Sequence, residues 1–125
     1  LSQQSFTSLL SLIPNNGLTC LFVAASNGNE RIVRQILPLL PEGYVNLACP
    51  YFHKPYKDIT YVTPLWIAIE KGNLEAAKIL LQHHADPNLA DSLHGRTCLH
   101  EAAWYGNTEA IALLLSFNAN PSVVE

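Results

Sequence analysis

The chain has 125 residues, a net charge of −3 and only 14% charged residues. Its length suits one domain, and its weakly acidic balance argues against non-specific nucleic-acid binding. No apolar run approaches the roughly 18 residues that a membrane span needs, so we expect neither nucleic acid nor a membrane as a partner. The three cysteines, Cys20, Cys49 and Cys98, are an odd number and lack metal-site spacing. We interpret them as free thiols in a reducing compartment, the cytoplasm or the nucleus.

The first predicted element covers residues 1–14. Its apolar residues at helical spacing are Phe6, Leu9, Leu10 and Ile13. A run of proline, asparagines and glycine at 14–17 then predicts a turn. We interpret the segment as an N-terminal capping helix or a degenerate repeat. An ordinary leading helix is the alternative, and it makes the same structural prediction.

Segment 15–57 predicts two helices, near Leu21–Asn27 and Glu30–Leu39. Its end, VNLAC, aligns with PNLAD later in the chain, so residues 50–57 are an insertion in the turn that follows the second helix. Two prolines restrict this inserted loop and lower the cost of ordering it. Its aromatic residues and two lysines suit contact with a partner that has an acidic rim, and an unconstrained loop is the alternative.

Segment 58–90 predicts two short helices joined by a tight turn. Thr63 is the N-cap of the first helix, and Gly72 supplies the left-handed conformation that stops it. Asn73 then caps the second helix, which ends near His84.

Segment 91–125 repeats this pattern, with Thr97–Asn120 matching Thr63–Asn88 at an offset of 34 residues. A weaker copy begins at Thr19. Helices shorter than about 12 residues are marginal in water, so each unit must bury its apolar face against the next one. Three units are about the minimum for such a stack. Because the chain starts with leucine and contains no methionine, we expect it to be a piece of a longer protein in which the third unit continues.

The repeated pattern resembles the ankyrin repeat over roughly residues 15–121. The last copy keeps Thr97, Leu99, His100, Ala102, Ala103, Gly106, Glu109, Leu113, Leu114 and Asn120. The middle copy keeps Thr63, Pro64, Leu65, Ala68, Gly72, Glu75, Leu80, Leu81, Ala85, Asp86 and Asn88. The resemblance implies an all-α solenoid of stacked helix-turn-helix repeats with projecting β-hairpin or turn fingers.

Some residues depart from the family pattern. Cys20 and Cys98 replace the proline and loosen the helix starts. Phe22 and Trp66 stand where the family has histidine, which leaves open whether these positions bond across repeats. In place of the left-handed glycine are His84 and Asn118, residue types that tolerate positive φ.

Catalytic chemistry has little support. The chain lacks a phosphate-binding glycine loop, metal-ligand spacing and a nucleophile with its base, so we expect no enzyme activity, cofactor, metal or small-molecule substrate within these residues. His83 and His84 diverge at a helix end, and with His53 they suit a surface role. The resemblance implies a structural hydrogen bond for His100. We expect the acidic residues to be spread over helix surfaces: Glu70, Glu75, Glu101 and Glu109.

Recognition of another protein or peptide remains. In the family the concave surface is built from the first helices and the finger tips, and the two positions before each helix-turn glycine face it. The predicted partner-binding residues are Trp104, Tyr105, Glu70, Lys71, Ser26, Asn27, Tyr51, Phe52, His53, Lys54, Tyr56, Lys57 and Arg96. Exposed aromatic residues are common hot spots, although Trp104 is alternatively a packing residue for a following repeat.

We therefore predict a protein–protein interaction module that works as a scaffold or adaptor. The alternative is the recognition or targeting arm of a larger protein: a ubiquitin-ligase adaptor, an enzyme, or a pathogen effector that acts on host proteins.

Overall fold

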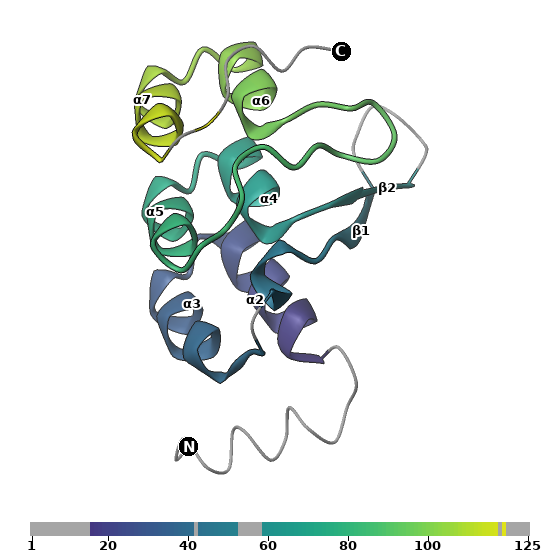
Figure 1. Cartoon of the computed structure of the whole chain (residues 1–125), viewed down its shortest axis with the longest axis vertical. Coiled ribbons are helices and arrows are strands. Elements are labelled where there is room, and N and C mark those ends of the chain that lie inside the picture. Colours follow the sequence, from purple (N-terminus) through teal and green to yellow (C-terminus); the bar gives the residue numbers. More distant parts are fainter. Residues whose placement is uncertain (1–15, 42, 53–58, 118, 120–125) are drawn as a thin grey trace.

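The described residues form a stack of three helix pairs (Figure 1). The structure, a computed structural model, describes residues 16–41, 43–52, 59–117 and 119. Helices α2, α4 and α6 form one column, and α3, α5 and α7 form a second column beside it. Their bounds are Asn16–Asn27 for α2, Glu30–Ile36 for α3, Pro64–Glu70 for α4, Leu74–Gln82 for α5, Cys98–Trp104 for α6 and Thr108–Ser116 for α7. The predicted solenoid of paired helices is confirmed.

The fingers project from the α2–α4–α6 column. Between the first and second pairs, β1 (Cys49–Phe52) and β2 (Ile59–Val62) form an antiparallel hairpin. Cys49 lies opposite Val62, and Phe52 lies opposite Ile59. The predicted insertion thus begins inside a strand of the finger, and its tip, like the helix predicted for residues 1–14, lies outside the described residues.

Two helix bounds in the first repeat differ from the prediction. Helix α2 begins at Asn16, because Cys20, unlike a proline, does not interrupt the helix there. Helix α3 ends at Ile36, and its predicted last turn is the 3-10 helix η1 (Leu37–Leu39), which contains Pro38. A second 3-10 turn, η2 (Tyr44–Asn46), leads into the finger.

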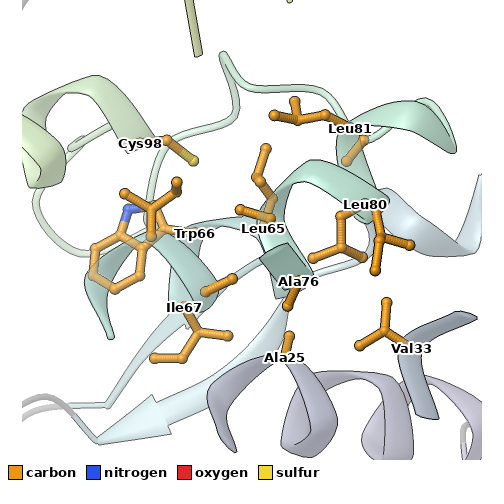
Figure 2. Close-up of a cluster of buried hydrophobic side chains, with 14 of the residues drawn as sticks. Ala25, Val33, Leu65, Trp66, Ile67, Ala76, Leu80, Leu81 and Cys98 are labelled. Carbon is orange, nitrogen blue, oxygen red and sulfur yellow. The ribbon is translucent and has the colours of Figure 1, made fainter. Parts of the chain in front are cut away.

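One apolar interior runs through the stack (Figure 2). Ala25 and Val33 of the first repeat lie beneath Ile67, Ala76 and Leu80 of the second, and all five are buried. The alanines keep side chains small where the helices approach closely, so the short helices bury their apolar faces against one another. Packing between repeats therefore supplies the stability that isolated helices lack.

The asparagines that follow the tight turns have two different roles. Asn29 and Asn107 cap α3 and α7, accepting from backbone N–H groups of the next turn. Asn73 takes the N-cap position of α5, as predicted, but its side chain makes no capping hydrogen bond. Its Nδ2 instead donates to the backbone carbonyls of Ala25 and Ser26, at 2.8 Å each, and so joins the second repeat to the first.

Position 28, beside the Asn73 side chain, requires glycine. Gly28 has φ +73°, and a Cβ there would lie 2.9 Å from Oδ1 of Asn73. Gly72 takes the predicted left-handed conformation with φ +75°, and His84 takes it too, with φ +72°. Asn118 lies outside the described residues.

Candidate protein-binding face

The ends of the inner helices and the hairpin β1–β2 together form the face on which the predicted binding residues lie. We call it the recognition face. At the end of α6, Trp104 is 72% exposed and Tyr105 is 55% exposed. At the end of α4, Glu70 is half-buried and Lys71 is exposed. The matching residues of the first repeat are Ser26, which is half-buried, and Asn27, which is exposed.

The hairpin is attached to this face by a cluster of three aromatic rings. The ring of Tyr51 on β1 contacts the rings of Phe22 and Trp66, with a centroid distance of 6.3 Å in each pair. Tilted pairs at this distance are favourable contacts. Phe22 and Trp66 are the two residues that replace the family's histidines, so they hold the finger. Sequence reasoning missed this role, although the coincidence of an aromatic insertion with two aromatic departures was a usable signal.

Tyr51 is also tied to the end of α4. Burial raises the pKa of its hydroxyl, and a hydrogen bond with Glu70 and the Glu70 charge raise it further, so the phenol is neutral. The ammonium of Lys71 lies 5.8 Å from the centroid of the same ring, within cation–π range. Three predicted binding residues therefore form one connected group.

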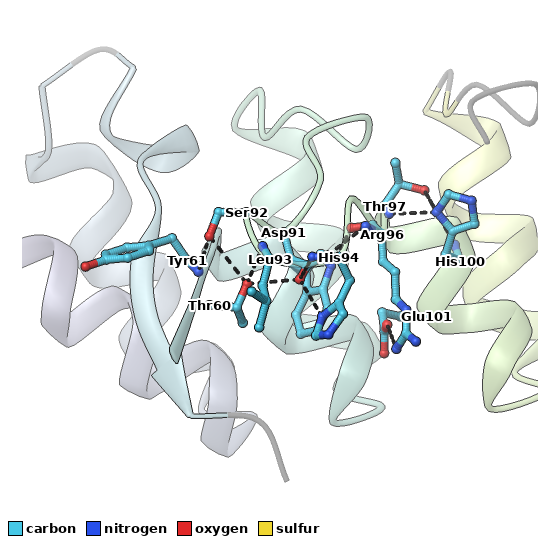
Figure 3. Close-up of polar contacts among 11 residues, drawn as sticks. Thr60, Tyr61, Asp91, Ser92, Leu93, His94, Arg96, Thr97, His100 and Glu101 are labelled. Atoms are coloured by element: carbon cyan, nitrogen blue, oxygen red, sulfur yellow. Dashed lines mark hydrogen bonds and ion pairs between the residues drawn. The ribbon is translucent and has the colours of Figure 1, made fainter. Parts of the chain in front are cut away.

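Trp66 stands where the family has histidine, and it makes a hydrogen bond to the next repeat. Its indole Nε1 donates to the backbone carbonyl of Arg96 in the next finger, at 2.9 Å. The guanidinium of Arg96 lies 5.7 Å from the ring centroid of Trp104. Nη1 of Arg96 also lies 3.7 Å from Oε1 of Glu101 (Figure 3). The substitution thus replaces a histidine contact with a different bond between repeats.

The finger that carries Arg96 is organised by a buried carboxylate (Figure 3). Asp91 accepts from the backbone N–H of Arg96 at 2.6 Å, from the Thr60 hydroxyl at 2.9 Å and from the backbone N–H of His94 at 3.1 Å. Burial alone would raise the pKa of Asp91, but these hydrogen bonds outweigh it and lower the pKa. Because Thr60 belongs to β2, Asp91 fixes one finger against the next.

The prediction that Glu101 lies on a helix surface is wrong. Its side chain packs between α4 and α6 and is 1% exposed, at the position that Ile67 occupies in the preceding repeat. Burial raises its pKa, the nearby Glu70 charge raises it further, and Arg96 opposes both, leaving the pKa at about 7. Oε1 of Glu101 accepts no hydrogen bond from the described residues. Glu75 and Glu109, in contrast, are exposed as predicted.

His100 makes the structural hydrogen bond that the resemblance implied. The backbone N–H of Thr97 donates to Nδ1 of His100 at 2.8 Å, and Thr97 in turn caps α6. This reciprocal capping box holds the helix start even though Cys98 replaces proline there. His83 and His84 are exposed at the end of α5, in keeping with a surface position.

The structure thus brings Tyr51, Glu70 and Lys71 together, and it places Arg96 against Trp104. Phe52 belongs to β1, but its side chain is not among those described. His53, Lys54, Tyr56 and Lys57 lie outside the described residues. The part that each of these residues plays in binding stays a prediction.

In the part of the chain that the structure describes, no helix has the length and apolar character to cross a membrane. Among the same residues, no three histidine, cysteine, aspartate or glutamate side chains gather as a metal site would require.

The stacked helix pairs, the capped turns and the projecting fingers define a repeat protein built for recognition. The chain belongs to the ankyrin repeat family: the profile described as "Ankyrin repeats (3 copies)" matches residues 3–91 and 42–124. Ankyrin repeats mediate protein–protein interaction and are not themselves catalytic.

Similar proteins carry these repeats within much longer chains. Ankyrin repeat and SAM domain-containing protein 6 of Rattus norvegicus is 34% identical over 100 residues, which is 80% of this chain and 10% of that protein. Putative E3 ubiquitin-protein ligase XBAT31 of Arabidopsis thaliana is 35% identical over 103 residues, 82% of this chain and 20% of that protein. Palmitoyltransferase ZDHHC17 of Danio rerio is 42% identical over 60 residues, 47% of this chain and 10% of that protein. The chain therefore spans a tenth to a fifth of the length of these relatives.

Proposed function

We propose that the recognition face binds a segment of a partner protein, with Trp104 and Tyr105 as its main anchors. The supporting observation is their exposure, 72% and 55%, at adjacent positions of a rigid helix end. Large aromatic side chains supply much of the binding energy at protein interfaces. An open hollow of about 380 Å³, lined by Arg96, His100, Ala103 and Trp104, lies beside them and offers room for a partner side chain.

The neighbouring contacts support this proposal because they hold the face in place before binding. Arg96 lies over the Trp104 ring, and Tyr51 contacts the rings of both Phe22 and Trp66. Side chains that are already ordered lose less conformational entropy on binding. The partner would then meet a preformed surface that extends from α6 to the hairpin.

The test compares the double variant Trp104→Ala/Tyr105→Ala with the unchanged chain, using peptides selected by the unchanged chain from a displayed random-peptide library. We expect the double variant to lose about 30-fold in affinity, or about 2 kcal/mol. We expect its melting temperature to change by less than about 2 °C, because both side chains are exposed.

The matched control is Leu115→Ala, which removes a 45% exposed apolar side chain from the outer helix α7. This control should bind the selected peptides as the unchanged chain does. A double variant that melts earlier but binds normally would mean that Trp104 and Tyr105 are packing residues, and it would contradict the proposal.

A second candidate function is favoured by the relatives. Because proteins named as ubiquitin ligases and palmitoyltransferases contain the matching repeats as a small part of their length, this chain is proposed, as an alternative, to be the recognition arm of a larger enzyme, adaptor or effector. The free thiols of Cys20, Cys49 and Cys98 support a reducing compartment, the cytoplasm or the nucleus. Sequencing the full transcript tests the arm hypothesis: an adjoining catalytic or adaptor-binding domain supports it, and a transcript without one contradicts it.

A further inference from the structure

The open hollow beside the exposed aromatic pair has a lining rich in hydrogen-bond donors. Arg96, His100, Ala103 and Trp104 line it, and we call it the α6 hollow. A guanidinium and an indole N–H are donors that cannot accept, and the alanine methyl is apolar. Histidine is the one side chain of the four that can act either as a donor or as an acceptor.

The hydrogen bond that His100 makes decides which of the two it offers to a partner. The backbone N–H of Thr97 donates to Nδ1 of His100 at 2.8 Å, so Nδ1 is the acceptor of the ring (Figure 3). An imidazole whose Nδ1 accepts carries its proton on Nε2. The nitrogen that remains for a partner is therefore a donor. All the polar side-chain groups of these four residues that remain for a partner are donors.

The α6 hollow also carries positive charge. The Arg96 side chain is 22% exposed, whereas Glu101, whose Oε1 lies 3.7 Å from Nη1 of Arg96, is 1% exposed. A partner at the surface therefore meets the guanidinium and not its counter-ion. Because the pKa of Glu101 is about 7, this carboxyl group balances the arginine charge only in part at neutral pH. The ring of Trp104, 5.7 Å from the guanidinium, helps to hold the cation in place.

We propose that the partner segment places an aspartate or glutamate side chain in the α6 hollow, where its carboxylate accepts hydrogen bonds from Arg96 and from Nε2 of His100. This inference rests on the proposed function of the recognition face and specifies the partner's chemistry. Hydrogen bonds from a guanidinium to a carboxylate are among the strongest in proteins. Ala103 and Trp104 are exposed and offer apolar surface to the methylene groups of the acidic side chain.

Other kinds of side chain suit the α6 hollow less well. A lysine or arginine would bring a second positive charge to Arg96, and like charges brought together oppose binding. A purely apolar side chain would exclude water from the donors of Arg96 and His100 without replacing the lost hydrogen bonds, which also opposes binding. A carboxylate supplies both the acceptor and the opposite charge.

The test starts from the library peptides whose binding depends on Trp104 and Tyr105, made with amidated C-termini so that their carboxylates are on side chains. We expect these peptides to share an aspartate or glutamate. Replacement of that residue by asparagine or glutamine should weaken binding about tenfold, because the amide keeps the shape and loses the charge. This comparison changes only the peptide, so it does not depend on the folding of any variant.

Two variants of the chain test where the carboxylate binds. Arg96→Gln should lose about tenfold in affinity for the acidic peptide and almost nothing for its amide counterpart. His100→Glu keeps a residue type that completes the capping box, but it places a carboxylate at the hollow. This variant should therefore lose at least about tenfold for the acidic peptide, with little change in melting temperature. Arg34→Gln, which removes an exposed arginine from the outer helix α3, is the matched control and should change neither affinity.

Peptides that depend on Trp104 and Tyr105 but share no acidic residue would overturn this inference and leave the proposed function intact. Binding of the acidic peptide to a folded Arg96→Gln variant as tightly as to the unchanged chain would do the same. If Arg96→Gln does not fold, unchanged binding to His100→Glu is the contradicting result. Finding no peptide that depends on Trp104 and Tyr105 would overturn the proposed function itself.

Discussion

Helices α4 and α6 have the same length and matching positions, yet their surroundings differ. In α4 every residue from Pro64 to Ile69 is buried, whereas in α6 only Cys98, Glu101 and Ala102 are. The inner apolar position is Ile67 in one helix and Glu101 in the other. The two residues before the turn glycine are the charged Glu70 and Lys71 at the end of α4. At the end of α6 they are the exposed aromatic residues Trp104 and Tyr105.

The difference distinguishes the effect of the repeated sequence motif from the effect of the adjacent repeats. The repeated caps and turn glycines fix the backbone of both helices, and the packing on either side decides how much of each helix is buried. Three of the positions where α6 departs from α4 are Glu101, Trp104 and Tyr105. Trp104 and Tyr105 are exposed on the recognition face, whereas Glu101 is buried. Substitutions at comparable positions of the repeats test this difference.

The largest effect is expected from the matched leucines. Leu65 is fully buried in the middle of the stack, so Leu65→Ala should lower the free energy of unfolding by about 3 kcal/mol. Leu99 is half-buried, so Leu99→Ala should cost about 1 kcal/mol. Urea unfolding followed by circular dichroism measures both, and equal costs would contradict the difference in burial.

Glu101 stands at the position that Ile67 occupies in the preceding repeat, and this difference predicts that the free energy of unfolding depends on pH. The folded chain keeps the Glu101 proton up to about pH 7, whereas the unfolded chain releases it near pH 4.5. Unfolding therefore releases a proton between these values, and this group makes the free energy of unfolding fall as pH rises from 4.5 to 7, by at most about 3 kcal/mol.

Glu101→Gln should remove this slope, and Glu101→Ile should raise stability at pH 8 by restoring the apolar residue of α4. Glu109→Gln, on an exposed site, is the control. Asp91 acts in the opposite direction, because its pKa is lowered, and its contribution is lost only as the pH falls below its usual value of 3.8. Stability that does not change between pH 4.5 and 7 would contradict the raised pKa of the buried Glu101.

A smaller difference is expected between Asn73 and Asn107. Asn73→Ala removes two hydrogen bonds to the first repeat and should cost about 2 kcal/mol. Asn107→Ala removes one helix cap and should cost about 1 kcal/mol. Native-state hydrogen exchange should also show faster opening of α2 and α3 in the Asn73 variant alone. If both variants open the same repeats, Asn73 does not join the repeats as described.

The smallest effect concerns the two left-handed residues that follow α4 and α5. Gly72 takes this conformation without strain, whereas His84 takes it as a residue with a Cβ, at φ +72°. His84→Gly should therefore stabilise the chain by up to about 1 kcal/mol, measured as a rise in melting temperature. A destabilised variant would mean that the exposed imidazole makes a contact that outweighs the strain.

The sequence predicted the features that repeat, because they follow from local chemistry: the Thr63 cap, the Gly72 stop and the His100 bond. It predicted less well where a residue acts across repeats. Asn73 fits a local cap, but the carbonyls of the first repeat lie within its reach and bind it instead. Glu101 fits an exposed helix position by its type, and only the packing of α4 against α6 buries it. The aromatic cluster that holds Tyr51 joins residues far apart in the chain, and such contacts cannot be predicted from a repeat pattern.

Amide hydrogen exchange, measured with and without a saturating peptide that depends on Trp104 and Tyr105, tests the recognition face most directly. Slower exchange is expected at the end of α6, the end of α4 and the hairpin, with α3, α5 and α7 unchanged. Protection confined to those outer helices would contradict binding at the recognition face.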